Sequence, residues 1–153
     1  LSQFDRVIIG ITNPDLTELV AHNESAHRHE TSANPFTYEV RKEIIKASLP
    51  HLESLEIIPF DLEQPTTWQV PSDTTFILRI FSPWELSKKD LFESNGYSTL
   101  VLDAPAIKIS ASEVRENLNL QDLSWREQVS DSAIETISTA WKNLGSNFAG
   151  AQV

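Results

Sequence analysis

The fold class is decided by residues 6–11, which read Arg-Val-Ile-Ile-Gly-Ile. The apolar residues of this stretch are mostly β-branched and adjacent, without the polar and apolar alternation of a strand that has one solvated face. Parallel strands that are covered on both faces read as such runs. The turn residues Thr-Asn-Pro-Asp follow at positions 12–15 and end the strand. We therefore predict a buried parallel strand over residues 6–11.

Strand and helix patterns alternate along the rest of the chain. A helix is predicted from Asn34 as N-cap, with Pro35 at its first helical position. Capping patterns at Ser82 and Ser110 predict two more helices, and Gly96 and Gly145 are predicted helix ends. Together, the predicted strands cover residues 6–11, 55–60, 75–81 and 98–102, and the last helix covers residues 131–144.

This alternation is typical of an α/β fold with an open, doubly wound, mostly parallel sheet and helices on both faces. We interpret residues 1–153 as a single domain of this kind. Ligands of such sheets bind outside the carboxyl ends of the strands. The segments after Ile11, Phe60, Phe81 and Leu102 are therefore expected to share one ligand-binding edge.

Composition narrows the possible functions. Apolar residues make up 40% of the chain and charged residues 22%, as in globular proteins. The net charge of −10 argues against a surface that binds nucleic acid. The sequence has no cysteine for disulfides or thiolate metal sites, and no apolar run of about 20 residues that could span a membrane. We predict a cytoplasmic protein.

Residues 109–115, Ile-Ser-Ala-Ser-Glu-Val-Arg, carry the strongest functional signal. A helix start presents unpaired backbone N–H groups and the positive end of the helix dipole, so it favours an anion. Ser110 and Ser112 add hydroxyl donors, and Arg115, one turn into the helix, can bind phosphate oxygens. The alternative is an ordinary capped helix with a solvated arginine.

Residues 109–115 resemble the Ile-Ser-x-(Ser/Thr)-x-(Ile/Val)-Arg motif of nucleotidyltransferases with a cytidylyltransferase-like fold, above all the nicotinamide-nucleotide adenylyltransferases. Two further stretches agree with that resemblance. Residues 7–11 look like the family's second strand, and Asn-Pro-Phe-Thr at 34–37, with Arg41, looks like its next helix. The resemblance extends over residues 5–120.

The resemblance implies a Rossmann-like fold and transfer of AMP from ATP to the phosphate of a mononucleotide such as nicotinamide mononucleotide. Pyrophosphate is released, and Mg²⁺ accompanies the ATP. By the same resemblance, Trp68 and Arg41 are substrate-binding candidates, and homo-oligomers are expected. The implied nucleotide- and phosphate-binding residues are Ser110, Ser112, Arg115, Gly10, Phe81 and Ser82.

The family's first motif, a glycine-rich strand end followed by His-x-Gly-His, does not occur in residues 1–153. The resemblance places this motif one strand and one helix before Arg6. The catalytic residues are therefore expected upstream of Leu1. Two other functions stay open: cytidylyl or adenylyl transfer to another phosphorylated small molecule, and a non-catalytic nucleotide-sensing module.

Several other side chains have both a binding and a structural interpretation. Arg28, between His27 and His29, is a candidate lid contact to a phosphorylated substrate or part of a solvated loop, and we predict no metal site there.

Arg41 either shapes a site or covers apolar neighbours on a helix surface. Trp68 either stacks on a base or plugs the core. Phe81 and Ser82 also fit a helix cap, Lys88 and Lys89 a solvated helix face, and Trp84, Trp125 and Trp141 the core.

Overall fold

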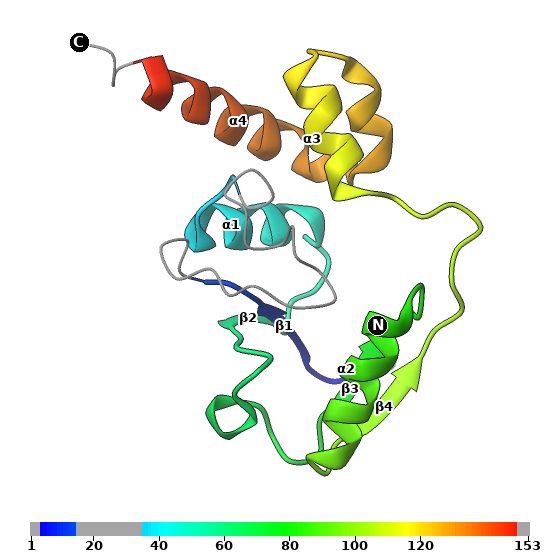
Figure 1. Ribbon diagram of the computed structural model, residues 1–153. Helices are drawn as coiled ribbons and strands as arrows, with labels where there is room; N and C mark the ends of the chain where they lie inside the picture. Colours follow the sequence, from blue (N-terminus) through cyan, green and yellow to red (C-terminus); the bar gives the residue numbers. More distant parts are fainter. Residues whose placement is uncertain (1–3, 15–34, 150–153) are drawn as a thin grey trace.

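The structure is a computed structural model that describes residues 4–14 and 35–149 (Figure 1). The predicted loop around His27, Arg28 and His29 lies outside these residues. The order of elements is β1 (Val7–Ile11), α1 (Tyr38–Ser48), β2 (Leu55–Pro59), η3 (Pro65–Thr67), β3 (Thr75–Leu78), α2 (Pro83–Ser94), β4 (Ser98–Val101), α3 (Ala111–Asn119), η4 (Leu123–Gln128), η5 (Asp131–Ala133) and α4 (Ile134–Ala149).

The strands form two separate parallel pairs. β1 pairs with β2, with Val7 opposite Leu55, and β3 pairs with β4, with Thr75 opposite Ser98. The mixed α/β class and the parallel pairing are confirmed. The single open sheet is not formed by the described residues, because no strand among them joins the two pairs. The strands of the two pairs also run in different directions (Figure 1).

The first helix begins later than its sequence predicts. Thr37, not Asn34, is the N-cap of α1, and Asn34 lies outside the described residues. Thr37 has an extended backbone, and its hydroxyl accepts a hydrogen bond from the Val40 N–H at 3.4 Å. Phe36 consequently precedes the helix, and its ring packs edge-on against Trp141, with centroids 5.9 Å apart.

Gly96 and Gly145 were both predicted to end a helix. α2 starts at Pro83 and ends before Gly96, whose φ of 86° needs a residue without a side chain, so both predicted ends are confirmed. α4 continues past Gly145 to Ala149, so the predicted stop there is wrong. A glycine inside a helix costs only about 1 kcal/mol, which neighbouring helical residues can overcome. In the described part of the chain, no helix has the length and apolar character needed to cross a membrane.

The buried residues form two clusters. The strand cluster consists of Ile58, Phe60, Leu62, Trp68 and Phe92. The helical cluster consists of Leu118, Trp125, Ala133 and Ile137, and it confirms the predicted core position of Trp125. α1 packs against β1 and β2 as well as η5 and α4, so it joins the strands to the C-terminal helices (Figure 1). An extended segment, residues 102–110, runs from β4 to α3 and is named the linking segment here.

Candidate functional site

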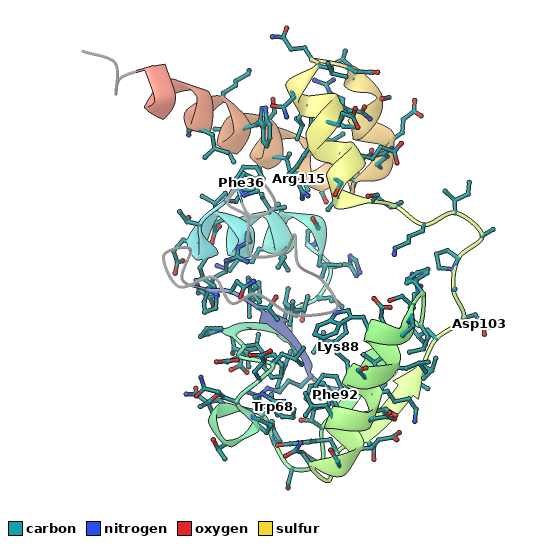
Figure 2. All side chains as sticks on the ribbon, in the orientation of Figure 1. Phe36, Trp68, Lys88, Phe92, Asp103 and Arg115 are labelled. Carbon is teal, nitrogen blue, oxygen red and sulfur yellow. The ribbon has the colours of Figure 1, made fainter. Side chains whose placement is uncertain are left out.

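A cavity of about 1100 Å³ lies between the two strand pairs and is named the central cavity here. One wall is β1 with the residues that flank it, and the opposite wall is β3. Trp84, Lys88 and Phe92 of α2 also line it. Figure 2 shows Lys88 and Phe92 beside the strands, in the same half of the molecule as Trp68. Lys88 is half-buried there, and its Nζ lies 5.5 Å from the centroid of the Trp84 ring.

Gly10 is the predicted nucleotide-binding residue that lines this cavity. It also has a packing role. A Cβ atom added at Gly10 would lie 2.8 Å from both Cβ and Cγ of Phe60. Real Cβ atoms do not approach other carbons so closely, so only glycine allows the Phe60 side chain to lie against β1. The close approach accounts for this residue type without a ligand.

Arg41 binds the backbone where β1 ends. Its Nη1 donates to the carbonyl oxygen of Thr12 at 2.8 Å, and its Nη2 donates to that of Asn13 at 2.5 Å. Asn13 has a φ of 49°, in the left-handed region, so the guanidinium holds a turn that few residues adopt unaided. Desolvation by burial lowers the pKa of Arg41. Arg41 therefore holds the turn after β1, and its predicted substrate contact stays a prediction.

Trp68 lies in the strand cluster. Its side chain is 8% exposed, its ring stacks on Phe60 with centroids 5.2 Å apart, and its Nε1 donates to the Asp61 carbonyl at 2.6 Å. Trp68 is therefore packed in the core, which is one of the two roles that its sequence predicts. Stacking on a substrate ring would require Trp68 to leave the cluster, and it stays a prediction without a contact in this structure.

The start of α3 matches its prediction in part. Ser110 is the N-cap and has an extended backbone, but its side chain makes no capping hydrogen bond. Arg115 Nη2 donates to the Ser112 hydroxyl at 3.1 Å, so these two side chains share one side of the first turn. Arg115 is half-buried, and desolvation lowers its pKa. Backbone N–H groups, hydroxyls and a guanidinium are thus gathered at this helix start, a combination suited to binding an anion.

Lys108 is a residue that sequence reasoning missed. Its Nζ lies 4.7 Å from the ring centroid of Phe81, whose side chain is 39% exposed. Lys108 stands two positions before Ser110, so this contact brings the end of the β3 region to the start of α3. A lysine immediately before a helix-start anion motif was the available signal. Ser82 occupies the N-cap position of α2, as its cap interpretation requires, but its hydroxyl donates to the Glu85 carboxylate at 2.5 Å and makes no capping hydrogen bond to the backbone.

The predicted site residues therefore fall into two groups. Gly10 and Arg41 lie at β1, while Phe81 and Ser82 lie near the linking segment that leads to Ser110. Figure 2 shows Arg115 separated from Trp68 and Lys88 by the body of the molecule, next to the C-terminal helices. Arg28 lies outside the described residues. Across residues 4–14 and 35–149, no three His, Cys, Asp or Glu side chains are grouped to hold a metal ion.

Comparison with known proteins gives one informative similarity. The chain is 26% identical over 122 residues to the phosphonoformate cytidylyltransferase of Streptomyces viridochromogenes. The match covers 73% of this chain and spans 65% of that protein's length. No protein-family profile matches the chain, and no solved structure resembles it significantly. Among known proteins, this similarity supports a relationship of the chain to the nucleotidyltransferases.

Proposed function

We propose that this chain belongs to an enzyme that transfers a nucleotidyl group from a nucleoside triphosphate to a phosphorylated or phosphonate-bearing small molecule. The observation that carries the proposal is the start of α3, where Ser110, Ser112 and Arg115 gather hydrogen-bond donors and positive charge at a helix N-terminus. The similarity to a cytidylyltransferase supports it independently.

The reaction needs no covalent bond between the protein and the substrate. An oxygen of the acceptor's phosphate or phosphonate attacks the α-phosphorus of the triphosphate, and the bond to the bridging oxygen breaks to release pyrophosphate. Such displacements are accelerated by positioning and by neutralising charge on the phosphates. Backbone N–H groups of α3, the Ser112 hydroxyl and Arg115 are the groups that we assign to the triphosphate. Lys108, two positions before Ser110 in the sequence, adds a further positive charge to this segment.

Mg²⁺ fits this proposal as a companion of the triphosphate. Magnesium sites in nucleotide enzymes often use one or two carboxylates together with substrate phosphates, so a dedicated protein cage is not required. When bound, Mg²⁺ would neutralise negative charge on the phosphates. The side chains of this chain would orient the nucleotide.

The donor and acceptor have two candidate assignments. The name of the similar protein favours CTP as donor and a small phosphonate as acceptor. The motif at 109–115, together with Asn-Pro-Phe-Thr at 34–37, favours ATP and nicotinamide mononucleotide. Within either assignment, we propose that the two strand pairs belong to one doubly wound sheet of the Rossmann-like kind.

A pyrophosphate-release assay on the complete gene product decides between these assignments. CTP and ATP are each offered with phosphonoformate, with nicotinamide mononucleotide, and with no acceptor. Release that needs CTP and phosphonoformate supports cytidylyl transfer, and release that needs ATP and the mononucleotide supports adenylyl transfer. Nucleotide binding without release with any pair contradicts the enzyme and favours the nucleotide-sensing alternative. Absence of binding as well contradicts the whole proposal.

Arg115→Ala tests the residues assigned to phosphate. We expect the variant to lose about tenfold in affinity for the triphosphate, because a hydrogen bond to a charged group contributes about 1.5–3 kcal/mol, and to keep its affinity for the nucleoside. Arg126→Ala is the matched control, since Arg126 is exposed on η4. Calorimetric titration measures both affinities. Equal losses for triphosphate and nucleoside would show that Arg115 acts on the fold and not on phosphate.

A further inference from the structure

The start of α3 carries the sequence of a capping box without its hydrogen bonds. Ser110 is the N-cap, and Glu113 is the third helical residue. In a capping box the serine side chain bonds to the N–H of the third residue, whose carboxylate reaches back to the N–H of the serine. In this protein the Ser110 side chain makes no capping hydrogen bond, and Oε1 of Glu113 accepts from Gln128 Nε2 at 2.8 Å. The carboxylate of Glu113 is therefore bonded to η4, where the sequence predicts a bond to the N-cap.

The core sets the distance between these two side chains. η4 packs against α3, and Trp125 of η4 is only 3% exposed. The valines that follow Glu113 and Gln128 in the sequence both pack against the helical cluster. The backbone at both positions is thus fixed by apolar packing on the same cluster. The hydrogen bond between Gln128 and Glu113 consequently does not have to draw the two segments together.

The orientation of the Gln128 amide shows which group it serves. Its Oε1 is buried and has no hydrogen-bond partner among the described residues, an arrangement that is unfavourable in free energy. Turning the amide by half a turn would place Oε1 against the Glu113 carboxylate, and two acceptors repel each other. Only the present orientation gives that carboxylate a donor. The amide therefore keeps its contact with Glu113 while its own oxygen is left without a partner.

We propose that Gln128 is a positioning residue for the triphosphate site at the start of α3. By binding the Glu113 carboxylate on the side of η4, it leaves the N–H groups of the first turn to the phosphates. A free carboxylate in the first turn is attracted to the same N–H groups and helix dipole as a phosphate, and it repels that phosphate. Gln128 acts through Glu113 and not on the nucleotide itself. This inference rests on the proposed function.

Calorimetric titration of the complete gene product tests the proposal, with whichever of CTP and ATP binds more tightly and with its nucleoside. Gln128→Ala releases the Glu113 carboxylate to the helix start. We expect the affinity for the triphosphate to fall about two- to fivefold, which is the usual effect of one charge in the first turn of a helix. The affinity for the nucleoside should not change. An unchanged affinity for the triphosphate overturns the proposal.

A second substitution separates this role from a purely structural one. In the double variant Gln128→Ala/Glu113→Gln, the affinity for the triphosphate should return to that of the native protein, because a neutral amide does not repel phosphate. Gln128→Ala/Glu116→Gln is the matched control, since Glu116 is exposed on the same helix and carries the same charge. The control should stay weakened. Restoration in both double variants, or in neither, contradicts the proposal.

Single substitutions extend the test to a protein that keeps Gln128. Glu113→Gln and Glu116→Gln should then each change the affinity for the triphosphate by less than about twofold. A larger gain for Glu113→Gln contradicts the proposal. Arg115→Ala separates this inference from the proposed function. If Arg115→Ala weakens triphosphate binding and Gln128→Ala does not, this inference alone fails. If neither variant weakens it, the proposed function fails as well.

Discussion

The two buried clusters of this protein differ in completeness. The helical cluster is closed: Ala133 is 0% and Trp125 is 3% exposed. The strand cluster adjoins the central cavity, and the strands beside it keep unpaired edges. The helical cluster is built largely from residues 114–141, with α1 packed on it, whereas the strand cluster depends on pairings between distant segments. Local helices can complete a core from nearby residues, but a parallel sheet needs every one of its strands.

Trp125→Ala should have the largest effect on stability, and it tests whether the helical cluster is closed. Removing a buried tryptophan side chain leaves a cavity and should lower the free energy of unfolding by about 3–5 kcal/mol. Urea unfolding measures the loss. Leu120→Ala is the control, because Leu120, the C-cap of α3, is 70% exposed, and it should change stability by less than about 0.5 kcal/mol. A similar small change for Trp125→Ala would remove the contrast between the clusters.

The same contrast explains what the sequence could predict. The strand at residues 6–11, the α2 ends and the core position of Trp125 depend on short-range patterns, and these predictions are confirmed. The predicted burial of that strand is wrong, because only Ile11 of Val7–Ile11 is buried. The single sheet and its shared ligand edge depend on which strands meet. No local pattern encodes that, and the described residues form two pairs instead.

The candidate site was predictable to a similar degree. Ser110 was found as a helix cap because capping has a local signature. Lys108 was missed as a site residue because the Phe81 ring, which it contacts, comes from another part of the chain. Arg41 was assigned to the correct region, but its contacts with the Thr12 and Asn13 carbonyls depend on a turn that only the structure shows.

Gly10→Ala tests the close packing of Phe60 against β1 in the strand cluster. The added methyl group would meet Phe60 at 2.8 Å, so Phe60 or β1 must move, and overpacking of this kind costs about 1–3 kcal/mol. Gly145→Ala is the matched change on the helical side. A Cβ at Gly145 meets nothing within 4 Å, so alanine there should stabilise α4 by about 0.5–1 kcal/mol. Opposite signs in thermal unfolding support this account, and a neutral Gly10→Ala contradicts it.

Arg41→Gln should have a smaller effect, confined to the turn after β1. The variant loses charge-assisted hydrogen bonds to two carbonyl oxygens. Because Arg41 is only half-buried, we expect a loss of about 1–2 kcal/mol in the free energy of unfolding. Lys42→Gln, at the next position of α1, is the control and should change stability by less than about 0.5 kcal/mol. Equal effects of the two variants would show that Arg41 does not hold the turn.

Asp122→Asn should give the smallest effect, visible as a dependence on pH. The Ser124 N–H donates to Asp122 Oδ1 at 2.9 Å at the start of η4, and this backbone hydrogen bond lowers the pKa of Asp122. A lowered pKa contributes stability that is present above the unfolded-state value of about 3.9 and is lost as pH falls through the lower folded-state value. The Tm advantage of the native protein over the variant should therefore be constant near pH 7 and shrink below about pH 4. An advantage that stays unchanged down to pH 2 would show that the charge of Asp122 does not stabilise the start of η4.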